Sequence, residues 1–469
     1  MTVLQPVSTP STTRAAAAPR RGVRWLHADL ATYLVVFIIY SNAAVIAVRF
    51  HGMPFIVAAG IPLLLGVPLL YYLLQRRQEL VITPVTLLAL AFLLVELLGT
   101  LFSKYVDVAA QNVLTFASEG LAIYLLLTNV IRHPRTLRGV LWAVLLAGIL
   151  MATFPIIQYA TGTYDSNYGG FAQADGAGVT TGQDLFGDVR QLRVAGVIGE
   201  KNFYAQMMLM VVPIGVMQAS AEKSWALRAL ALLSAGMSAA AVALTFSRGA
   251  AVGFVVMLLV AVFMRAVTTR QFAVIVLVAA VLLAMFPVYA SRVMSVLSVT
   301  TFVKDDAEVQ VDRAIEGRLT EMVVAARIFA DYPWVGVGPG VYKYYSRAYS
   351  NEVGLLQLTG TREAHSLYLA LAADTGLPGI LAFLAIAFTA IFDLGRVRRQ
   401  FRSTNRAYAN MSSGVLLGLV SYLTTGIFLH MAYERYFWLM LGIAVAAANI
   451  ARNWPPDSVS TPSTAEEVR

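Results

Sequence analysis

One histidine and three arginines are the residues of this chain whose types and settings best suit chemistry. His365 lies in the run AHSLYLALAADTGLPG. A neutral imidazole near pH 7 can take a proton from a hydroxyl group. Arg318 opens a helical run after a glycine, Arg248 stands in a Ser-Arg-Gly turn, and Arg193 begins the run RVAGVIGEKN. Each arginine keeps a permanent charge that needs a partner, water or an anionic ligand.

Each of these residues also has a purely structural interpretation. Arg248 can extend to the headgroup level of a membrane, since nothing else between Arg228 and Arg265 is charged. Arg318 can form an ion pair with Glu321, Arg193 can belong to a flexible turn, and His365 can be satisfied at an interface. Glu96 and Glu119 interrupt apolar runs, where an acid is either functional or hydrogen-bonded to a neighbouring helix.

The segment that contains Arg318 predicts an amphipathic helix over 313–330. Its apolar face at a period of 3.6 residues consists of Ile315, Leu319, Met322, Val323, Ala326 and Phe329. Arg313, Thr320 and Arg327 are expected on the opposite face, and Arg318 beside the apolar stripe, pointing at the protein body. This helix should lie on the helix bundle or on the membrane surface. Pro333 ends it, and a glycine-rich turn over 336–340 follows.

The composition excludes an ordinary soluble enzyme. Of the 469 residues, 58% are hydrophobic and 13% charged, and the mean hydropathy is +0.69. Soluble domains carry about 25% charged residues. The net charge of +9 is not read as a sign of nucleic-acid binding, because the basic residues stand in loops beside apolar runs. Cysteine is absent, which excludes disulfides and thiol catalysis, and no phosphate loop, HExxH or metal-ligand pattern occurs.

Apolar runs of about 20 residues recur and predict membrane-spanning helices. The predicted fold class is all-α: a polytopic membrane protein of about twelve transmembrane helices with one large outer loop that contains amphipathic helices. The expected spans are 31–48, 54–74, 84–102, 109–129, 140–159, 203–219, 225–246, 250–264, 272–289, 377–394, 414–428 and 436–450.

The predicted organisation follows from these spans. A disordered cytoplasmic tail (1–28) precedes transmembrane helices 1–9 (29–291), which include an outer loop at 161–201. The large outer loop (292–366), transmembrane helices 10–12 (367–452) and a second disordered cytoplasmic tail (453–469) complete the chain.

The distribution of Lys and Arg predicts the orientation. With the N-terminus inside, inner segments hold 20 of the 35 basic residues, and the short outer loops hold 4. Because positive charge marks the cytoplasmic side of short loops, both termini should be cytoplasmic and both long loops outside.

Together, the motifs resemble the bacterial O-antigen ligase and polymerase superfamily. The resemblance covers residues 190–395 and rests on four stretches: RVAGVIGEKNFYAQ, TFSRGA, GRLTEMVVAARIFADYPWVGVGPGVY and HSLYLALAADTGLPG. The family typically shows a Gly-Arg opening, a Pro-x-x-Gly-x-Gly turn, a His-Asn/Ser pair and an acidic-x-Gly-x-x-Gly ending. Asp374 departs from the usual Glu of that ending, which puts the reach of this carboxylate in doubt.

The resemblance implies a glycosyltransferase of the bacterial cytoplasmic membrane that works on its periplasmic face. The donor would be a glycan on undecaprenyl diphosphate. The acceptor would be a sugar hydroxyl on lipid A core or on a growing polysaccharide, with inversion and without metal, cofactor or nucleotide sugar. Arg248 and Arg318, with Arg193 weaker, would hold the diphosphate because guanidinium groups bind phosphate in a bidentate manner. His365 would activate or orient the acceptor hydroxyl.

Other functions stay open on the sequence alone. Within the family, the motifs do not distinguish a ligase, which uses lipid A core, from a polymerase, which joins repeat units. A transporter or flippase of lipid-linked sugars is the main alternative, although no inverted repeat or paired broken spans are evident. A membrane scaffold is the third interpretation.

Overall fold

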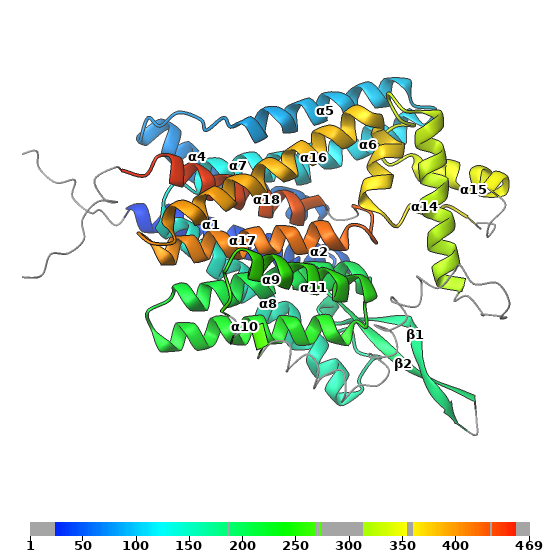
Figure 1. Cartoon of the computed structure of the whole chain (residues 1–469), viewed down its shortest axis with the longest axis horizontal. Coiled ribbons are helices and arrows are strands. Elements are labelled where there is room, and N and C mark those ends of the chain that lie inside the picture. Colours follow the sequence, from blue (N-terminus) through cyan, green and yellow to red (C-terminus); the bar gives the residue numbers. More distant parts are fainter. Residues whose placement is uncertain are drawn as a thin grey trace, which may run out of the picture.

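The chain forms a bundle of membrane-spanning helices with its soluble elements gathered at one end (Figure 1). The computed structural model describes residues 24–184, 187–268, 270, 272–273, 313–353, 360–431 and 434–455. Over these ranges the chain is almost entirely helical, which confirms the all-α class. The predicted span at 272–289, the first part of the loop at 292–366 and most of both predicted tails lie outside the described residues.

The first half of the chain supplies the spans that precede the hairpin, several of them built from shorter helices in series. They are α1 (Arg24–Tyr40), α2 (Ala43–His51), α3 (Phe55–Gly60), η1 (Pro62–Leu65), α4 (Gly66–Leu70), η2 (Tyr71–Gln75), α5 (Pro84–Phe102), α6 (Val106–Thr115), η3 (Phe116–Leu121), α7 (Ala122–Val130) and α8 (Pro134–Thr161).

The remaining elements begin with a short 3₁₀ turn and a β-hairpin in the loop at 161–201. They are η4 (Tyr168–Gly170), β1 (Gln173–Asp184), β2 (Gly187–Gly196), α9 (Lys201–Ala221), α10 (Trp225–Leu244), α11 (Arg248–Phe263), α14 (Arg313–Asp331), α15 (Tyr342–Val353), α16 (Leu367–Phe401), α17 (Arg406–Thr425) and α18 (Glu434–Arg452). The strands pair antiparallel from Gln173–Gly196 to Asp184–Gly187.

Seven spans within the described residues are long and apolar enough to cross a bilayer, or eight if the bent pair α1–α2 is one span. α11 is apolar but shorter. The predicted span 84–102 coincides with α5, whose start is fixed by Pro84 at N1 and a capping box between Thr83 and Thr86. The total of twelve spans stays a prediction.

The centre of the bundle consists of α9, α17 and α18. α9 packs against α10 and α17, and α18 packs against α7, α16 and α17. Small residues allow close approach: a Cβ at Gly215 would lie 2.7 Å from the Ala231 carbonyl oxygen. Membrane helices associate through such close packing, because lipid and protein are equally apolar. By contrast, α5 and α10 expose large leucines such as Leu101 and Leu232 toward the bilayer.

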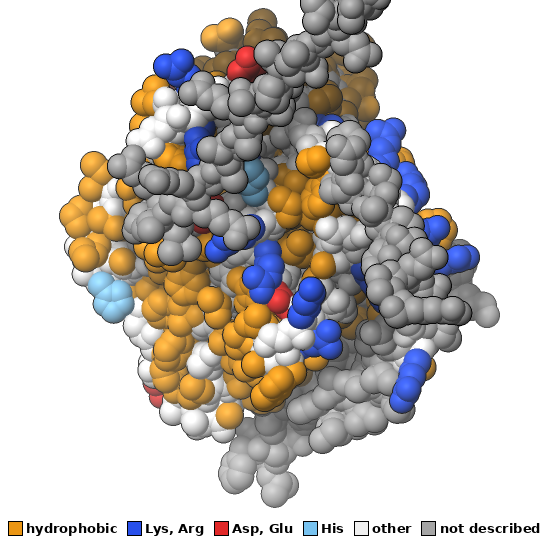
Figure 2. All heavy atoms as spheres, turned by 90° about the vertical axis from the view of Figure 1, so that its left-hand side faces the viewer, with side chains coloured by type: hydrophobic (Ala, Val, Ile, Leu, Met, Phe, Trp, Pro, Cys, Tyr) orange, Lys and Arg blue, Asp and Glu red, His pale blue; other side chains and the backbone are white. Residues whose placement is uncertain are grey.

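The two ends of the bundle differ in chemistry. β1, β2, α14 and α15 lie at the end opposite the start of α1 and the end of α18 (Figure 1). Figure 2 views the latter end, where Lys and Arg side chains gather around the face. Loops and helix ends on this side supply Arg76, Arg77, Arg132, Arg135, Lys223, Arg265, Arg396 and Arg452.

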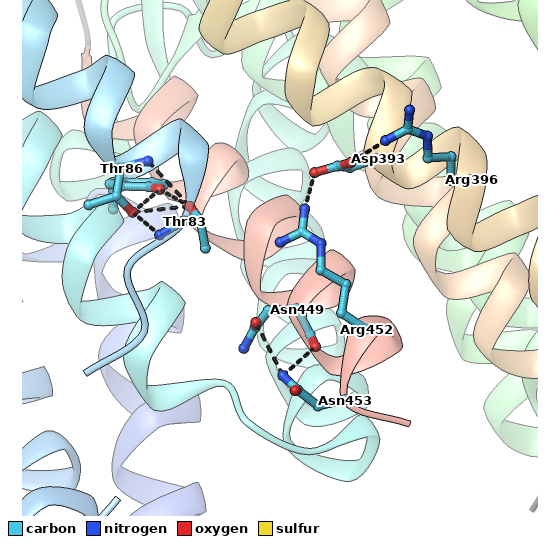
Figure 3. Close-up of polar contacts among 8 residues, drawn as sticks. Thr83, Thr86, Asp393, Arg396, Asn449, Arg452 and Asn453 are labelled. Carbon is cyan, nitrogen blue, oxygen red and sulfur yellow. Dashed lines mark hydrogen bonds and ion pairs between the residues drawn. The ribbon is translucent and has the colours of Figure 1, made fainter. Parts of the chain in front are cut away.

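Two polar contacts fasten helices together near this basic end (Figure 3). Asp393 of α16 forms ion pairs with Arg396 of the same helix and with Arg452 of α18. The side chains of Thr83 and Thr86 hydrogen-bond to each other and to the Tyr124 hydroxyl of α7. These contacts connect α16 to α18 and α5 to α7.

The predicted helix over 313–330 is confirmed as α14, but the assignment of its faces was wrong. The buried side chains are Thr320, Glu321, Val324, Ala325 and Ile328, which face α15 and α16. Leu319, placed on the apolar face, is 53% exposed, and Thr320 is buried instead of pointing away. One face of the helix therefore packs on the protein, while Leu319 and Val323 of the predicted apolar face are exposed. α14 runs across the end of the bundle, nearly perpendicular to the spans (Figure 1).

Candidate functional site

His365 sits at the point where the outer segment turns into α16. Its backbone has φ 43°, a left-handed conformation that a non-glycine residue rarely adopts and that often marks a functional position. Ser366 caps α16 by accepting a hydrogen bond from the Leu369 N–H, and the Leu367 N–H donates to the Gly426 carbonyl at 2.7 Å. The histidine is therefore held in place from both α16 and the end of α17.

The imidazole of His365 lies beside a buried carboxyl group of α14. Nε2 is 3.6 Å from Glu321 Oε2, and Glu321 is only 3% exposed. Burial lowers the pKa of His365 to about 4, with help from the positive charges of Arg318, His430, Arg362 and Lys201. Burial raises the pKa of Glu321 to about 7, opposed by Arg362 and Arg318. His365 is neutral at pH 7, so this contact is then not an ion pair.

Arg318 stands one turn before Glu321 on α14 and is half-buried. Its charge acts on both Glu321 and His365. Arg318 and Glu321 therefore lie close enough to each other for the structural interpretation, in which Arg318 pairs with Glu321. The same proximity places a fixed cation next to the histidine.

Arg193 and Arg248 both lie at the turn between α10 and α11. Arg193 is buried, and its Nε donates to the Thr245 carbonyl at 3.0 Å. Ser247 caps α11 by accepting from the Ala250 N–H, and its hydroxyl lies 3.0 Å from Asn202 Oδ1. Arg248, the first residue of α11, is half-buried. The runs RVAGVIGEKN and SRG therefore form one unit.

His430, in the loop between α17 and α18, connects this unit to His365. Its ring packs edge-on against Phe203 of α9, with centroids 5.1 Å apart, and lies 6.0 Å from the His365 ring. A Cβ at Gly249 would lie 3.3 Å from Phe428 of the same loop. Burial lowers the pKa of His430 to about 4. All four predicted site residues thus lie at one end of the bundle, with His365 and Arg318 adjacent.

The glycine-rich turn and the acidic-x-Gly motif pack against each other. The N–H groups of Val337 and Gly338 donate to the carbonyls of Ala373 and Asp374, both at 2.9 Å. The Asp374 carboxylate accepts from the N–H groups of Gly340 and Tyr342 at 3.1 and 2.8 Å. Asp374 therefore reaches its partners despite replacing the Glu expected at this position. It positions the start of α15.

Gly376 makes this packing possible. Its φ of 67° and ψ of −168° belong to a region open essentially to glycine alone. A Cβ here would lie 2.7 Å from the Trp334 carbonyl carbon. The backbone is not helical at Gly376, so α16 consists of two helical segments that meet at this kink. The second segment begins where the predicted span at 377–394 begins and extends past it to Phe401.

Sequence reasoning missed several polar residues of this end. His430 is not among the candidate residues of the sequence analysis, and Glu321 appears there only as a partner of Arg318. Arg435 pairs with Glu119 at 2.9 Å, which gives this acid of η3 a structural partner. The available signal was the cluster of His430, Glu434 and Arg435 in a short connection between two apolar spans.

The described residues contain no group of three or more His, Asp or Glu side chains placed to hold a metal ion. The site is instead a set of fixed cations around a neutral histidine and a buried carboxyl group. Its chemistry would be proton transfer combined with anion binding.

Fold and site together define a multi-pass membrane protein with a polar, arginine- and histidine-containing site at one end of its bundle. Residues 231–384, from α10 to α16, match the family model described as O-antigen ligase. This match, over about a third of the chain, supports the resemblance to the O-antigen ligase and polymerase superfamily. Arg248, Arg318 and His365 lie inside the matched residues, and Arg193 lies before them. The comparison with curated proteins gives no match.

Proposed function

We propose that this protein transfers a glycan from undecaprenyl diphosphate to an acceptor sugar hydroxyl on the outer face of the bacterial cytoplasmic membrane. The observation that carries the proposal is the neutral, partly buried His365 beside Glu321, within the electrostatic influence of Arg318. A base and a fixed cation at one place are what this transfer requires. The family match supports the same class of reaction.

The arginines would stabilise the leaving group. When the anomeric carbon–oxygen bond breaks, its electron pair goes to the diphosphate, whose charge must be held. Arg248 begins α11 and Arg318 lies within α14 at the same end of the bundle, and both are half-buried. A guanidinium in such a setting binds phosphate more strongly than one fully in water. Arg193 would brace the Arg248 turn through Thr245 and contribute charge.

His365 would take the proton of the acceptor hydroxyl as its oxygen attacks the anomeric carbon. Nδ1 is covered and has no hydrogen-bond partner, whereas the side chain as a whole is 30% exposed. The accessible edge is therefore that of Nε2. Glu321, 3.6 Å from this nitrogen, would stabilise the imidazolium that forms. Attack opposite the leaving diphosphate inverts the anomeric centre.

The acceptor would be either lipid A core or the growing polysaccharide. The first makes the protein a ligase and the second a polymerase. Purified protein in liposomes, given undecaprenyl diphosphate-linked repeat units with and without lipid A core, separates the two. Glycan on the core identifies a ligase, and longer chains on the lipid carrier identify a polymerase.

Single substitutions test the assigned roles. Arg318→Ala, Arg248→Ala and His365→Ala should each lower transfer by about 100-fold or more, the usual effect of losing one preorganised charge or base. Arg327→Ala is the matched control, because Arg327 lies on the same helix but is 59% exposed and paired with Asp331. Full transfer by all three variants, inserted normally, would contradict the proposal. Movement of the donor across the liposome without transfer would favour a transporter.

A further inference from the structure

A cavity of about 270 Å³ lies next to His430, between the helical spans and the start of α15. Its lining comes from α5, α6, η3, α15, α16, α18 and the loops before α16 and α18. The polar lining consists of Glu96, Asn112, Lys343, Glu363, Asp374, Thr375, His430 and Glu434. The aromatic lining is Phe92, Phe116 and Trp438. We call this space the Glu96 cavity.

Two of the four acidic groups already have partners. Glu363 forms an ion pair with Lys343 at 3.5 Å. Asp374 accepts the backbone hydrogen bonds described above. These contacts hold the wall formed by α15 and α16 and do not account for the other acids.

Four buried polar atoms around the cavity have no hydrogen-bond partner in the described structure. They are Glu96 Oε2, Glu434 Oε2, Trp438 Nε1 and His430 Nδ1. Glu96 is 7% exposed and Trp438 is fully covered. Buried polar groups are nearly always hydrogen-bonded, so orphans gathered around one space indicate an occupant. The carboxylates need donors and the indole N–H needs an acceptor.

We propose that the Glu96 cavity binds one neutral sugar ring of the acceptor, a subsite that rests on the proposed transferase function. A sugar offers hydroxyl groups that donate and accept, together with an apolar C–H face for the aromatic wall. The cavity is a poor site for the diphosphate of the donor, because Lys343 is the only Lys or Arg among the described residues of its lining and is already paired with Glu363. His430, which lines the cavity, has its ring centroid 6.0 Å from that of His365, so a bound ring would be adjacent to the proposed base.

Binding can be measured without donor and without transfer. Protein labelled with 5-fluorotryptophan carries six probes, and Trp438→Phe identifies the resonance of the cavity wall. Titration with methyl glycosides of a hexose, an N-acetylhexosamine and a 6-deoxyhexose should shift that resonance saturably for at least one of them. Glu96→Gln should weaken this binding about tenfold, the effect of one lost hydrogen bond to a charged group. Glu352→Gln, on the exposed side of α15, is the control.

Each outcome decides the proposal. A shift with sodium chloride or methylammonium chloride but not with sugars would identify a cation site and overturn it. No shift with any addition would mean that the cavity holds only water, which also overturns it. If Glu96→Gln fails to insert, Glu434→Gln provides the same comparison from α18.

Transfer kinetics then separate this subsite from the reaction itself. Glu96→Gln should raise KM for the acceptor about tenfold while kcat and KM for the donor stay close to wild type. A rise in donor KM instead would overturn the assignment to the acceptor. If the wild-type protein transfers nothing, the proposed function fails, and the fluorine titration still decides whether the cavity binds sugar.

Discussion

At the scale of single residues, the electrostatics around His365 determine when it can act as a base. Its pKa of about 4 arises first from burial and then from neighbouring cations, which disfavour the protonated form. His365 is therefore neutral across pH 5–8, and its own protonation should lower activity only as the pH drops toward 4. Glu321, whose pKa is about 7, loses its charge at higher pH, so the acid limb of kcat/KM that belongs to His365 is the lower of two and lies well below the value of 6.5 for a free histidine.

Arg362→Gln tests this cause, because Arg362 contributes positive charge near His365 and has no proposed contact with the substrate. Removing the charge should raise the pKa of His365 and move the acid limb upward by less than about one pH unit. Arg347→Gln, exposed on α15, should leave the limb unchanged. The absence of a limb near pH 4 in the wild type, or no movement of that limb in Arg362→Gln, would show that His365 is not the titrating base.

The site residues that could be predicted from the sequence are those that stand apart from other charged or polar residues along the chain. Arg248 has no charged neighbour along two spans, and His365 stands at a change from loop to apolar run. Glu321 and His430 were not predicted as partners, because their importance comes from long-range packing. Glu321 reaches His365 only after α14 folds across the bundle, and His430 meets Phe203 from a different span.

At the scale of elements, the kink of α16 determines how the site loop is held. Gly376→Ala should lower the melting temperature and disturb the start of α15, because a Cβ meets the backbone of Trp334. A forced left-handed conformation costs about 1–3 kcal/mol before any clash is counted. Thermal unfolding in detergent measures the change. Gly395→Ala in the same helix is the control: no atom lies within 4 Å, and Ala favours helix. Equal stability of the two variants would contradict this account of the kink.

A second prediction at this scale concerns the exposed apolar side chains of α14. Leu319 is exposed, whereas the polar Arg327 is exposed elsewhere on the helix. If the apolar side chains lie in the membrane interface, a spin label at Leu319→Cys should be accessible to oxygen, and one at Arg327→Cys to a water-soluble nickel complex. The chain has no cysteine, so each label is unique. Aqueous accessibility at both positions would place α14 away from the lipid.

Element boundaries were predictable where local chemistry marks them and not where tertiary contacts set them. Pro84 and its capping box mark the start of α5 in the sequence. The predicted span at 377–394 begins at the Gly376 kink of α16, but it leaves out the helical segment from Leu367 before the kink and the last residues to Phe401. The buried face of α14 was misassigned because the helix carries apolar residues both on the face that packs against the protein and on a face that is exposed.

At the scale of the whole molecule, the asymmetry of charge between the two ends predicts the orientation in the membrane. Lys and Arg gather at the end that holds the start of α1 and the end of α18 (Figure 2). Positive charge is retained on the cytoplasmic side, so α14, α15 and the hairpin should face outward. A site that binds a lipid-linked donor at the outer side of the membrane needs this arrangement.

Cysteine labelling in intact cells tests the orientation, since the wild-type chain has no cysteine to react. Asn351→Cys on α15 and Lys223→Cys between α9 and α10 are both exposed positions at opposite ends of the bundle. A membrane-impermeant maleimide should modify Asn351→Cys in intact spheroplasts and Lys223→Cys only after the membrane is permeabilised. The reverse pattern would place the site in the cytoplasm, where a periplasmic acceptor cannot reach His365, and the proposed reaction would fail with the orientation.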